Sequence, residues 1–225
     1  MTIAENLEKF NKELPNNVTL VAVSKTKPVS DLMEAYNAGQ RVFGENKIQE
    51  MEAKWEEMPK DIQWHMIGHV QRNKVKYMAP FVSLIHAVDS LKLLKEIDKE
   101  AEKNERTIEC LLQIKIAEED SKFGMGYADA VKLLSSEEFK KLQNVKIVGL
   151  MGMATFTEDE KQISEEFQKL KNIYDQFRIQ PFDCAQGDNF RILSMGMSSD
   201  YKIAIENGSN MIRVGSSIFG ERNYE

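Results

Sequence analysis

Eight apolar segments alternate with amphipathic segments along almost the whole sequence, and this alternation constrains the fold more than any other feature. The apolar segments show little polar alternation, which is typical of strands covered on both faces. The segments between them have apolar residues at helical spacing, and two of these segments begin at Ser30 and Ser90. Residues 1–14 predict a further helix before the first strand. The predicted strands are 19–23, 42–44, 62–67, 84–88, 108–116, 146–151, 192–195 and 211–214.

Eight strands with intervening helices in 225 residues predict one α/β domain, residues 1–225, folded as a (β/α)8 TIM-type barrel with an extra N-terminal helix. A doubly wound open sheet has the same alternation, and periodicity alone leaves it as an alternative. No linker, repeat or low-complexity tract divides the chain. We interpret the stretch QPFDCAQGDNF, residues 180–190, as a surface loop that leads into the seventh strand.

Composition argues against several classes of protein. The net charge is −6 with both signs mixed along the chain, so there is no basic face for a nucleic acid. The two cysteines, Cys110 and Cys184, give neither a disulfide framework nor a paired metal spacing. The N-terminal segment has no apolar core of a signal peptide, and no apolar run is long enough to cross a bilayer. We therefore expect a reduced, cytoplasmic protein that binds neither nucleic acid nor membrane.

Small polar residues follow the last two predicted strands. The ends of barrel strands meet at one face, which is where the functional sites of such barrels lie. In SMGMSSD and IRVGSSIFG, small residues stand where a strand gives way to a helix, and such turns direct backbone N–H groups outward, as a phosphate requires. Either turn alone has a purely conformational explanation. Two such turns on consecutive strands favour a shared phosphate site.

Lys25 follows the first predicted strand, in the segment LVAVSKTKPVSD. Taken alone, it is best interpreted as a solvated charge at a strand end. The alternative is an amine held in the barrel mouth, where partial desolvation makes a lysine nucleophilic. An amine, a phosphate site and Arg213 at another strand end suit pyridoxal 5′-phosphate (PLP). This cofactor needs an amine for its aldehyde, donors for its phosphate and a partner for its ring nitrogen.

Other groups of residues give weaker evidence for a functional site. His65 and His69 are four residues apart in HMIGH, but they straddle a strand end and a glycine, and no glutamate follows His65. We therefore do not expect a metal site there. His86 lies in an apolar strand and is expected to be a hydrogen-bonded core residue. No serine stands in the G-x-S-x-G pattern of a nucleophile elbow.

A set of short motifs in a fixed order resembles one known family, the pyridoxal phosphate homeostasis proteins, also described as YggS/PROSC-type. The resemblance implies a barrel similar to the N-terminal domain of alanine racemase. It also implies that PLP is held as a lysine aldimine without established catalytic turnover, in vitamin B6 and amino-acid homeostasis. It runs from the first strand to Gly220, and only residues 180–190 match no motif. The motifs are AVSKTKP, FGENKIQE, WHMIGHVQRNK, EEDSKFG, GLMGMAT, SMGMSSD and IRVGSSIFG.

The resemblance also implies the site residues. The lysine of VSKTKP carries the Schiff base in this family, and here it is Lys25 rather than Lys27. In the related racemases, an arginine two residues before a glycine faces the pyridine nitrogen, and this pattern falls on Arg213. The other implied residues are Ser198, Gly215 and Ser216 for the phosphate, with Asn46 and His65 at the rim.

Two functional classes follow from this resemblance. One is a PLP carrier or regulator, whose partners would be PLP and PLP-dependent apo-enzymes. The other is an active racemase or decarboxylase of the same fold. Such racemases use a tyrosine supplied with help from a C-terminal β-domain and a partner subunit, and this sequence ends at Glu225, soon after the eighth strand. We therefore expect a non-catalytic, monomeric carrier. A barrel for another phosphorylated metabolite would leave Lys25 unexplained.

Overall fold

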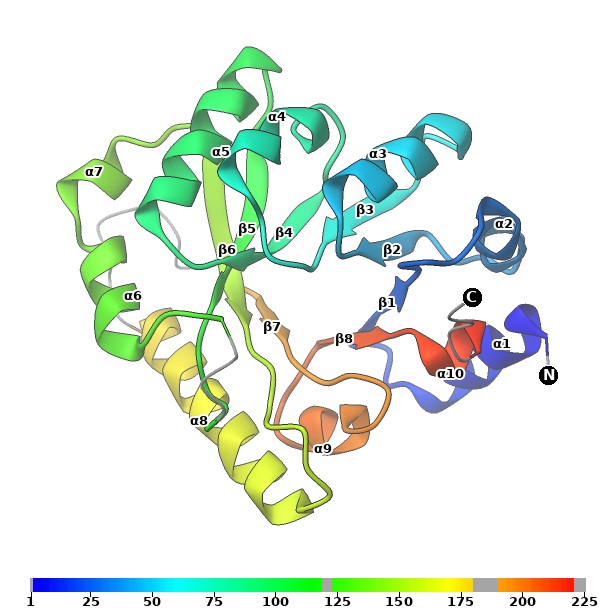
Figure 1. Ribbon diagram of the computed structural model, residues 1–225. Helices are drawn as coiled ribbons and strands as arrows, with labels where there is room; N and C mark the ends of the chain where they lie inside the picture. Colours follow the sequence, from blue (N-terminus) through cyan, green and yellow to red (C-terminus); the bar gives the residue numbers. More distant parts are fainter. Residues whose placement is uncertain (1, 119–122, 180–189, 221–225) are drawn as a thin grey trace.

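Eight parallel strands pair in chain order and close into a barrel, with the first strand hydrogen-bonded to the last. The computed structural model describes residues 2–118, 123–179 and 190–220. The closed barrel confirms the predicted fold and excludes the open sheet (Figure 1). The strands are β1 (Thr19–Val23), β2 (Val42–Glu45), β3 (Gln63–Met66), β4 (Leu84–Val88), β5 (Ile108–Gln113), β6 (Val145–Met151), β7 (Ile192–Ser194) and β8 (Met211–Val214).

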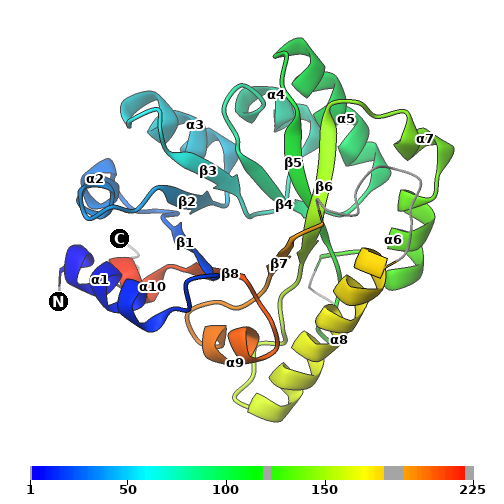
Figure 2. The same ribbon diagram turned by 180° about the vertical axis from the view of Figure 1, so that it is seen from behind.

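Helices surround the barrel on the outside in both views (Figure 1, Figure 2). The predicted N-terminal helix is present, and it starts at a capping box in which Glu5 N–H donates to Thr2 Oγ1 and Thr2 N–H donates to Glu5 Oε2. The helices are α1 (Ile3–Glu13), α2 (Val29–Asn37), α3 (Ile48–Glu57), the 3-10 turn η1 (Arg72–Lys74), α4 (Val75–Met78), α5 (Leu91–Lys103), α6 (Tyr127–Leu134), α7 (Glu137–Lys140), α8 (Glu160–Ile179), α9 (Tyr201–Glu206) and α10 (Ser216–Phe219).

The strands are buried on both faces, which explains why their sequences lack alternation. All residues of β4 are buried. One face of the strands packs against the helices in a large apolar core. The other face contributes to a smaller cluster, which contains Val21, Leu84, Ala87, Leu111, Val148, Met151 and Met211.

Three predicted strands are shorter in the structure, and the seventh, β7, ends at Ser194 instead of residue 195. β5 ends at Gln113, because the chain there turns to pair with a later segment: Met125 N–H donates to Gln113 O over 2.9 Å. β3 covers only Gln63–Met66 of the predicted 62–67. The predicted loop at 180–190 lies outside the described residues except for Phe190. No helix within the described ranges is both long and apolar enough to span a bilayer.

Candidate functional site

The carboxyl ends of the strands open into a cavity of about 590 Å³. Loops that follow the first three strands and the last four contribute to its wall. All of the predicted site residues except His65 line this cavity: Lys25, Asn46, Ser198, Arg213, Gly215 and Ser216.

Lys25 is carried to the cavity by the end of β1. The ladder between β1 and β2 extends one residue beyond the strand, because Ser24 N–H donates to Gly44 O over 3.0 Å. The chain then turns sharply, and Thr26 has a φ of +65°. Lys27 also lines the cavity, but its Nζ donates to the carbonyl oxygen of Phe219 in α10 over 2.8 Å. Both lysines of SKTK therefore reach the same cavity, and Lys27 is tied to α10 there.

The turns after β7 and β8 bring hydroxyl and N–H donors together. Gly215 N–H donates to Ser198 Oγ over 3.3 Å, which joins the two turns directly. The first of these turns is tight: Gly196 has a φ of +97°, and a Cβ there would lie 2.6 Å from Ala204 Cβ. Ser216 is the first residue of α10 and lines the cavity beside Gly215. This cluster of small donors suits an anion.

Arg213 reaches the cavity from β8 but is almost fully buried, at 4% exposure. Its Nη1 donates to Ser194 Oγ over 2.7 Å, and its Nη2 donates to the carbonyl oxygen of Gly152 over 3.1 Å. Burial lowers the pKa of the guanidinium to about 10, and the carboxylate of Asp200 opposes this shift. Arg213 is therefore a cation at neutral pH, held in place by two acceptors.

Behind Arg213, a chain of hydrogen bonds continues across the barrel interior. Ser194 Oγ lies 3.1 Å from His86 Nδ1, and His86 Nε2 lies 3.1 Å from His65 Nδ1. Burial lowers the pKa of His65 to about 3. Burial also lowers the pKa of His86 well below its usual value, with smaller contributions from His65 and Arg213. Both rings are therefore neutral at physiological pH.

His65 does not line the cavity, in contrast to the interpretation of it as a rim residue. It lies within β3, and its ring is buried against that of His86. The histidine at the cavity wall is His69, which lies beyond the end of β3. Its ring stacks on Phe123 at a centroid distance of 4.7 Å, and its Nδ1 is 3.6 Å from Asp89 Oδ2.

Several other cavity residues were not anticipated from the sequence. Gln113 ends β5 and donates from Nε2 to the carbonyl oxygen of Phe123 over 3.0 Å. The signal for it was a polar residue within the apolar strand predicted over 108–116. Phe123 and Phe156 are large apolar side chains with exposures of 57% and 86%, and both belong to the cavity wall. Their unusual exposure appears only in the folded structure.

Comparison with known proteins agrees with this geometry. The family model described as "Alanine racemase, N-terminal domain" matches residues 1–223. A "Pyridoxal phosphate homeostasis protein" of Aquifex aeolicus (strain VF5) is 37% identical over 210 residues, which cover 93% of this chain and 89% of the relative. The chain belongs to the pyridoxal phosphate homeostasis protein family.

Solved structures extend this assignment. PipY of Synechococcus elongatus PCC7942, solved with PLP bound, has a TM-score of 0.85 and 35% identity to this chain, and the match covers 97% of this chain and all of PipY. Alanine racemase from E. faecalis has a TM-score of 0.68 at 13% identity, covering 98% of this chain and 58% of the racemase. The racemase therefore shares the fold with this member of the homeostasis family.

Proposed function

We propose that this protein binds PLP covalently through Lys25 and serves as a non-catalytic carrier in vitamin B6 and amino-acid homeostasis. The observation that carries the proposal is that Lys25, Arg213 and the Ser198–Gly215 pair of turns all line one cavity. The name of the curated relatives and the PLP bound in PipY support this choice of cofactor. The proposed setting is the cytoplasm, with the protein as a monomer and PLP-dependent apo-enzymes as recipients.

The residues of the cavity fit this group. Bound PLP supplies an aldehyde that bonds covalently to an amine and a pyridine ring that withdraws electrons when its nitrogen is protonated. Lys25 supplies the amine. Ser198 and Ser216 supply hydroxyl donors for the phosphate, and Gly215 keeps the two turns together through its N–H to Ser198 Oγ. Hydrogen bonds to a charged acceptor are stronger than neutral ones. Arg213 supplies a fixed cation for the ring nitrogen.

The state of Arg213 favours a carrier over a catalyst. Its guanidinium is a cation at neutral pH, with a pKa of about 10, and Ser194 and Gly152 hold it in place. A neighbouring fixed cation disfavours a second positive charge, so Arg213 opposes protonation of the ring nitrogen. Carbanion chemistry on amino acids is slow without that proton, since the ring then accepts electrons poorly.

Borohydride reduction tests the covalent bond. The purified protein should be yellow, and reduction followed by peptide mapping should find a pyridoxyl group on Lys25. Lys25→Ala should lose the label, whereas the matched variant Lys27→Ala should keep it, because the Lys27 amine contacts Phe219 O. A label on Lys27 or Lys122 would contradict the assignment.

An active racemase or decarboxylase is the second candidate, because alanine racemase shares the barrel. Racemisation of alanine or serine separates the two functions. We expect rates well below about 1 s⁻¹, the lower end of ordinary enzyme turnover. A turnover above that value, abolished by Lys25→Ala, would establish the enzyme and reject the carrier.

A further inference from the structure

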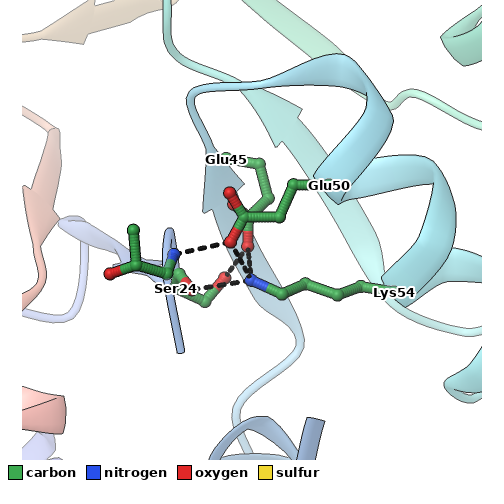
Figure 3. A network of polar contacts seen from close by, with 5 residues as sticks. Ser24, Glu45, Glu50 and Lys54 are labelled. Carbon is green, nitrogen blue, oxygen red and sulfur yellow. Dashed lines mark hydrogen bonds and ion pairs between the residues drawn. The ribbon is translucent and has the colours of Figure 1, made fainter. Parts of the chain in front are cut away.

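A buried ion-pair network of Glu45, Glu50 and Lys54 contacts Ser24, the residue before Lys25 in the sequence (Figure 3). Its centre is Lys54 of α3, which is only 6% exposed. Lys54 Nζ contacts three oxygen atoms: Glu45 Oε1 at 2.7 Å, Glu50 Oε1 at 2.8 Å and the carbonyl oxygen of Ser24 at 2.8 Å. The network therefore joins the end of β1, the end of β2 and one face of α3.

The same network holds the residues on both sides of Lys25. On the N-terminal side, Ser24 donates from Oγ to Glu45 Oε1 over 2.6 Å and accepts from Lys54 through its carbonyl oxygen. On the C-terminal side, Thr26 N–H donates to Glu50 Oε1 over 2.5 Å. The backbone that carries Lys25 is thus fixed at its two neighbours.

Thr26 requires such support, because its φ of +65° is unfavourable for a β-branched residue. A left-handed conformation is unfavourable for a non-glycine residue and persists only where the surroundings enforce it. The contact to Glu50 provides that enforcement. This geometry also determines the direction in which the chain leaves β1, and hence where the Lys25 side chain begins.

Stability alone does not account for the network. Burying ion pairs is costly, and well-packed apolar residues in their place are often neutral or stabilising. Burial raises the pKa of Glu45, although Lys54 and Ser24 oppose the shift. Among the described residues, Glu45 Oε2 is a buried carboxylate oxygen without a hydrogen-bond partner. A costly network that contacts both neighbours of one lysine indicates a geometric role.

We propose that Glu50 and Lys54 are positioning residues that aim the Lys25 amine at the PLP aldehyde; this inference rests on the proposed function. In the step concerned, the Lys25 nitrogen adds to the aldehyde carbon. The two amine hydrogens leave with the aldehyde oxygen as water, and one carbon–nitrogen double bond replaces one carbon–oxygen double bond. No oxidation or reduction occurs. The network acts on the approach of the nitrogen and leaves the phosphate contacts unchanged.

The variant Glu50→Ala tests whether covalent capture of PLP by Lys25 slows while non-covalent binding in the cavity stays unchanged. Glu50 is partly exposed, at 24% of its side chain, so its removal is tolerable for folding. Two probes are used on apo-protein: PLP, whose covalent capture is followed by its visible band, and pyridoxine 5′-phosphate, which has the phosphate and ring but no aldehyde. A small misplacement of a reacting group can cost about a hundredfold in rate, so we expect capture to slow by about ten- to a hundredfold. The dissociation constant of pyridoxine 5′-phosphate should stay at its wild-type value.

Two further variants complete the design. Glu50→Gln keeps an oxygen acceptor for Thr26 N–H and Lys54 Nζ, so it should restore rapid capture. Glu56→Ala removes an exposed glutamate from the same helix and should behave as wild type. Unchanged capture in Glu50→Ala, or an equal loss for both probes, would overturn the positioning role. Absence of any label on Lys25 in the wild-type protein would instead reject the proposed function.

Discussion

At the scale of single residues, Gly215 shows how closely β8, the last strand, approaches β1, the first strand. A Cβ at this position would lie 3.1 Å from the carbonyl oxygen of Val23 and 3.3 Å from Val23 Cβ. Its φ is −121°, so its backbone conformation does not require glycine. The requirement comes from the approach of β8 to β1. A larger residue would push apart the strand ends that carry Lys25 and Arg213.

The first prediction at this scale concerns the donors for the phosphate. Hydrogen bonds to a charged acceptor contribute roughly 1.5–3 kcal/mol each. Ser198→Ala and Ser216→Ala should therefore each weaken PLP binding by about ten- to a hundredfold, with the fold intact. Gly215→Val should weaken it further, because its side chain also collides with Val23.

The measurement is a titration of apo-protein with PLP and with pyridoxal, followed by the visible band. Pyridoxal has no phosphate, so it should bind much more weakly than PLP, and the serine substitutions should leave its binding nearly unchanged. Equal affinity of the wild-type protein for the two compounds would show that Ser198 and Ser216 do not hold a phosphate.

The sequence identified part of the cavity wall, namely residues that directly follow strands. Lys25, Ser198 and Ser216 stand at strand ends, and such ends meet at one face of a barrel. His65 was assigned to the rim although the predicted strand 62–67 already contained it. β3 covers Gln63–Met66, and the His65 ring faces His86 across the barrel interior, which the sequence pattern alone does not indicate. The network of Lys54 was not predicted, since no local pattern relates α3 to the turn after β1.

At the scale of elements, β6 contains an irregularity that only glycine allows. The pairing of β5 with β6 changes register between Cys110 and Leu111, which pair with Ile147 and Gly149. This shift leaves one extra residue on β6, as in a β-bulge. At the bulge, a Cβ on Gly149 would lie 1.7 Å from the carbonyl oxygen of Ile192 in β7. The β6–β7 pairing therefore depends on residue 149 being glycine, which has no side chain.

Gly149→Ala should accordingly separate β7 from β6 and destabilise the protein. Inserting one methyl group into a packed interior lowers the free energy of unfolding by about 1–3 kcal/mol. Because the methyl group here collides with a backbone oxygen, we expect a loss at or above the upper end of that range. The check is the free energy of unfolding from urea denaturation. Gly126→Ala is the matched control, because a Cβ there meets only Asp129 Oδ2 at 3.7 Å. Equal effects of the two substitutions would contradict this account of the bulge.

All eight strands were predictable because buried strands are continuous apolar runs. Their ends were less predictable where tertiary pairing decides them. β5 stops at Gln113 since Met125 returns to hydrogen-bond there, and no feature of residues 114–116 indicates this. The short elements η1 and α4 were also missed, since three or four residues cannot display a helical period.

At the scale of the whole molecule, the hydrogen-bonded chain from His65 to Arg213 joins four strands, β3, β4, β7 and β8. The lowered pKa values of His65 and His86 couple this chain to pH. In the unfolded chain, histidines bind protons as the pH falls through about 6.5. In the folded protein, His65 stays neutral until about pH 3. The unfolded state therefore binds more protons across this window, and stability falls as the pH falls.

Between pH 7 and pH 5, His65 should lower the free energy of unfolding by about 2 kcal/mol, and His86 should act in the same direction. The direct observation is the ¹⁵N chemical shift of the ring nitrogens. His65 and His86 should keep the shifts of neutral rings at pH 5 in the folded protein. The same protein unfolded in urea is the control, where both rings should be protonated at that pH. A protonated His86 in the folded protein at pH 5 would contradict the buried chain.

Because β1 pairs with β8, the proposed cofactor site depends on the order in which the chain is synthesised. Of the eight strands, β1, which precedes Lys25, leaves the ribosome first, and β8, which contains Arg213, leaves it last. Until β8 forms, β1 has an unpaired edge, and the cavity that Lys25 lines lacks the wall that Arg213 contributes. A chain interrupted after β7 would therefore present the lysine but no complete site. In the proposed carrier, a ligand that contacts residues at the ends of both strands favours the closed barrel by mass action, so PLP stabilises the pairing of β1 with β8.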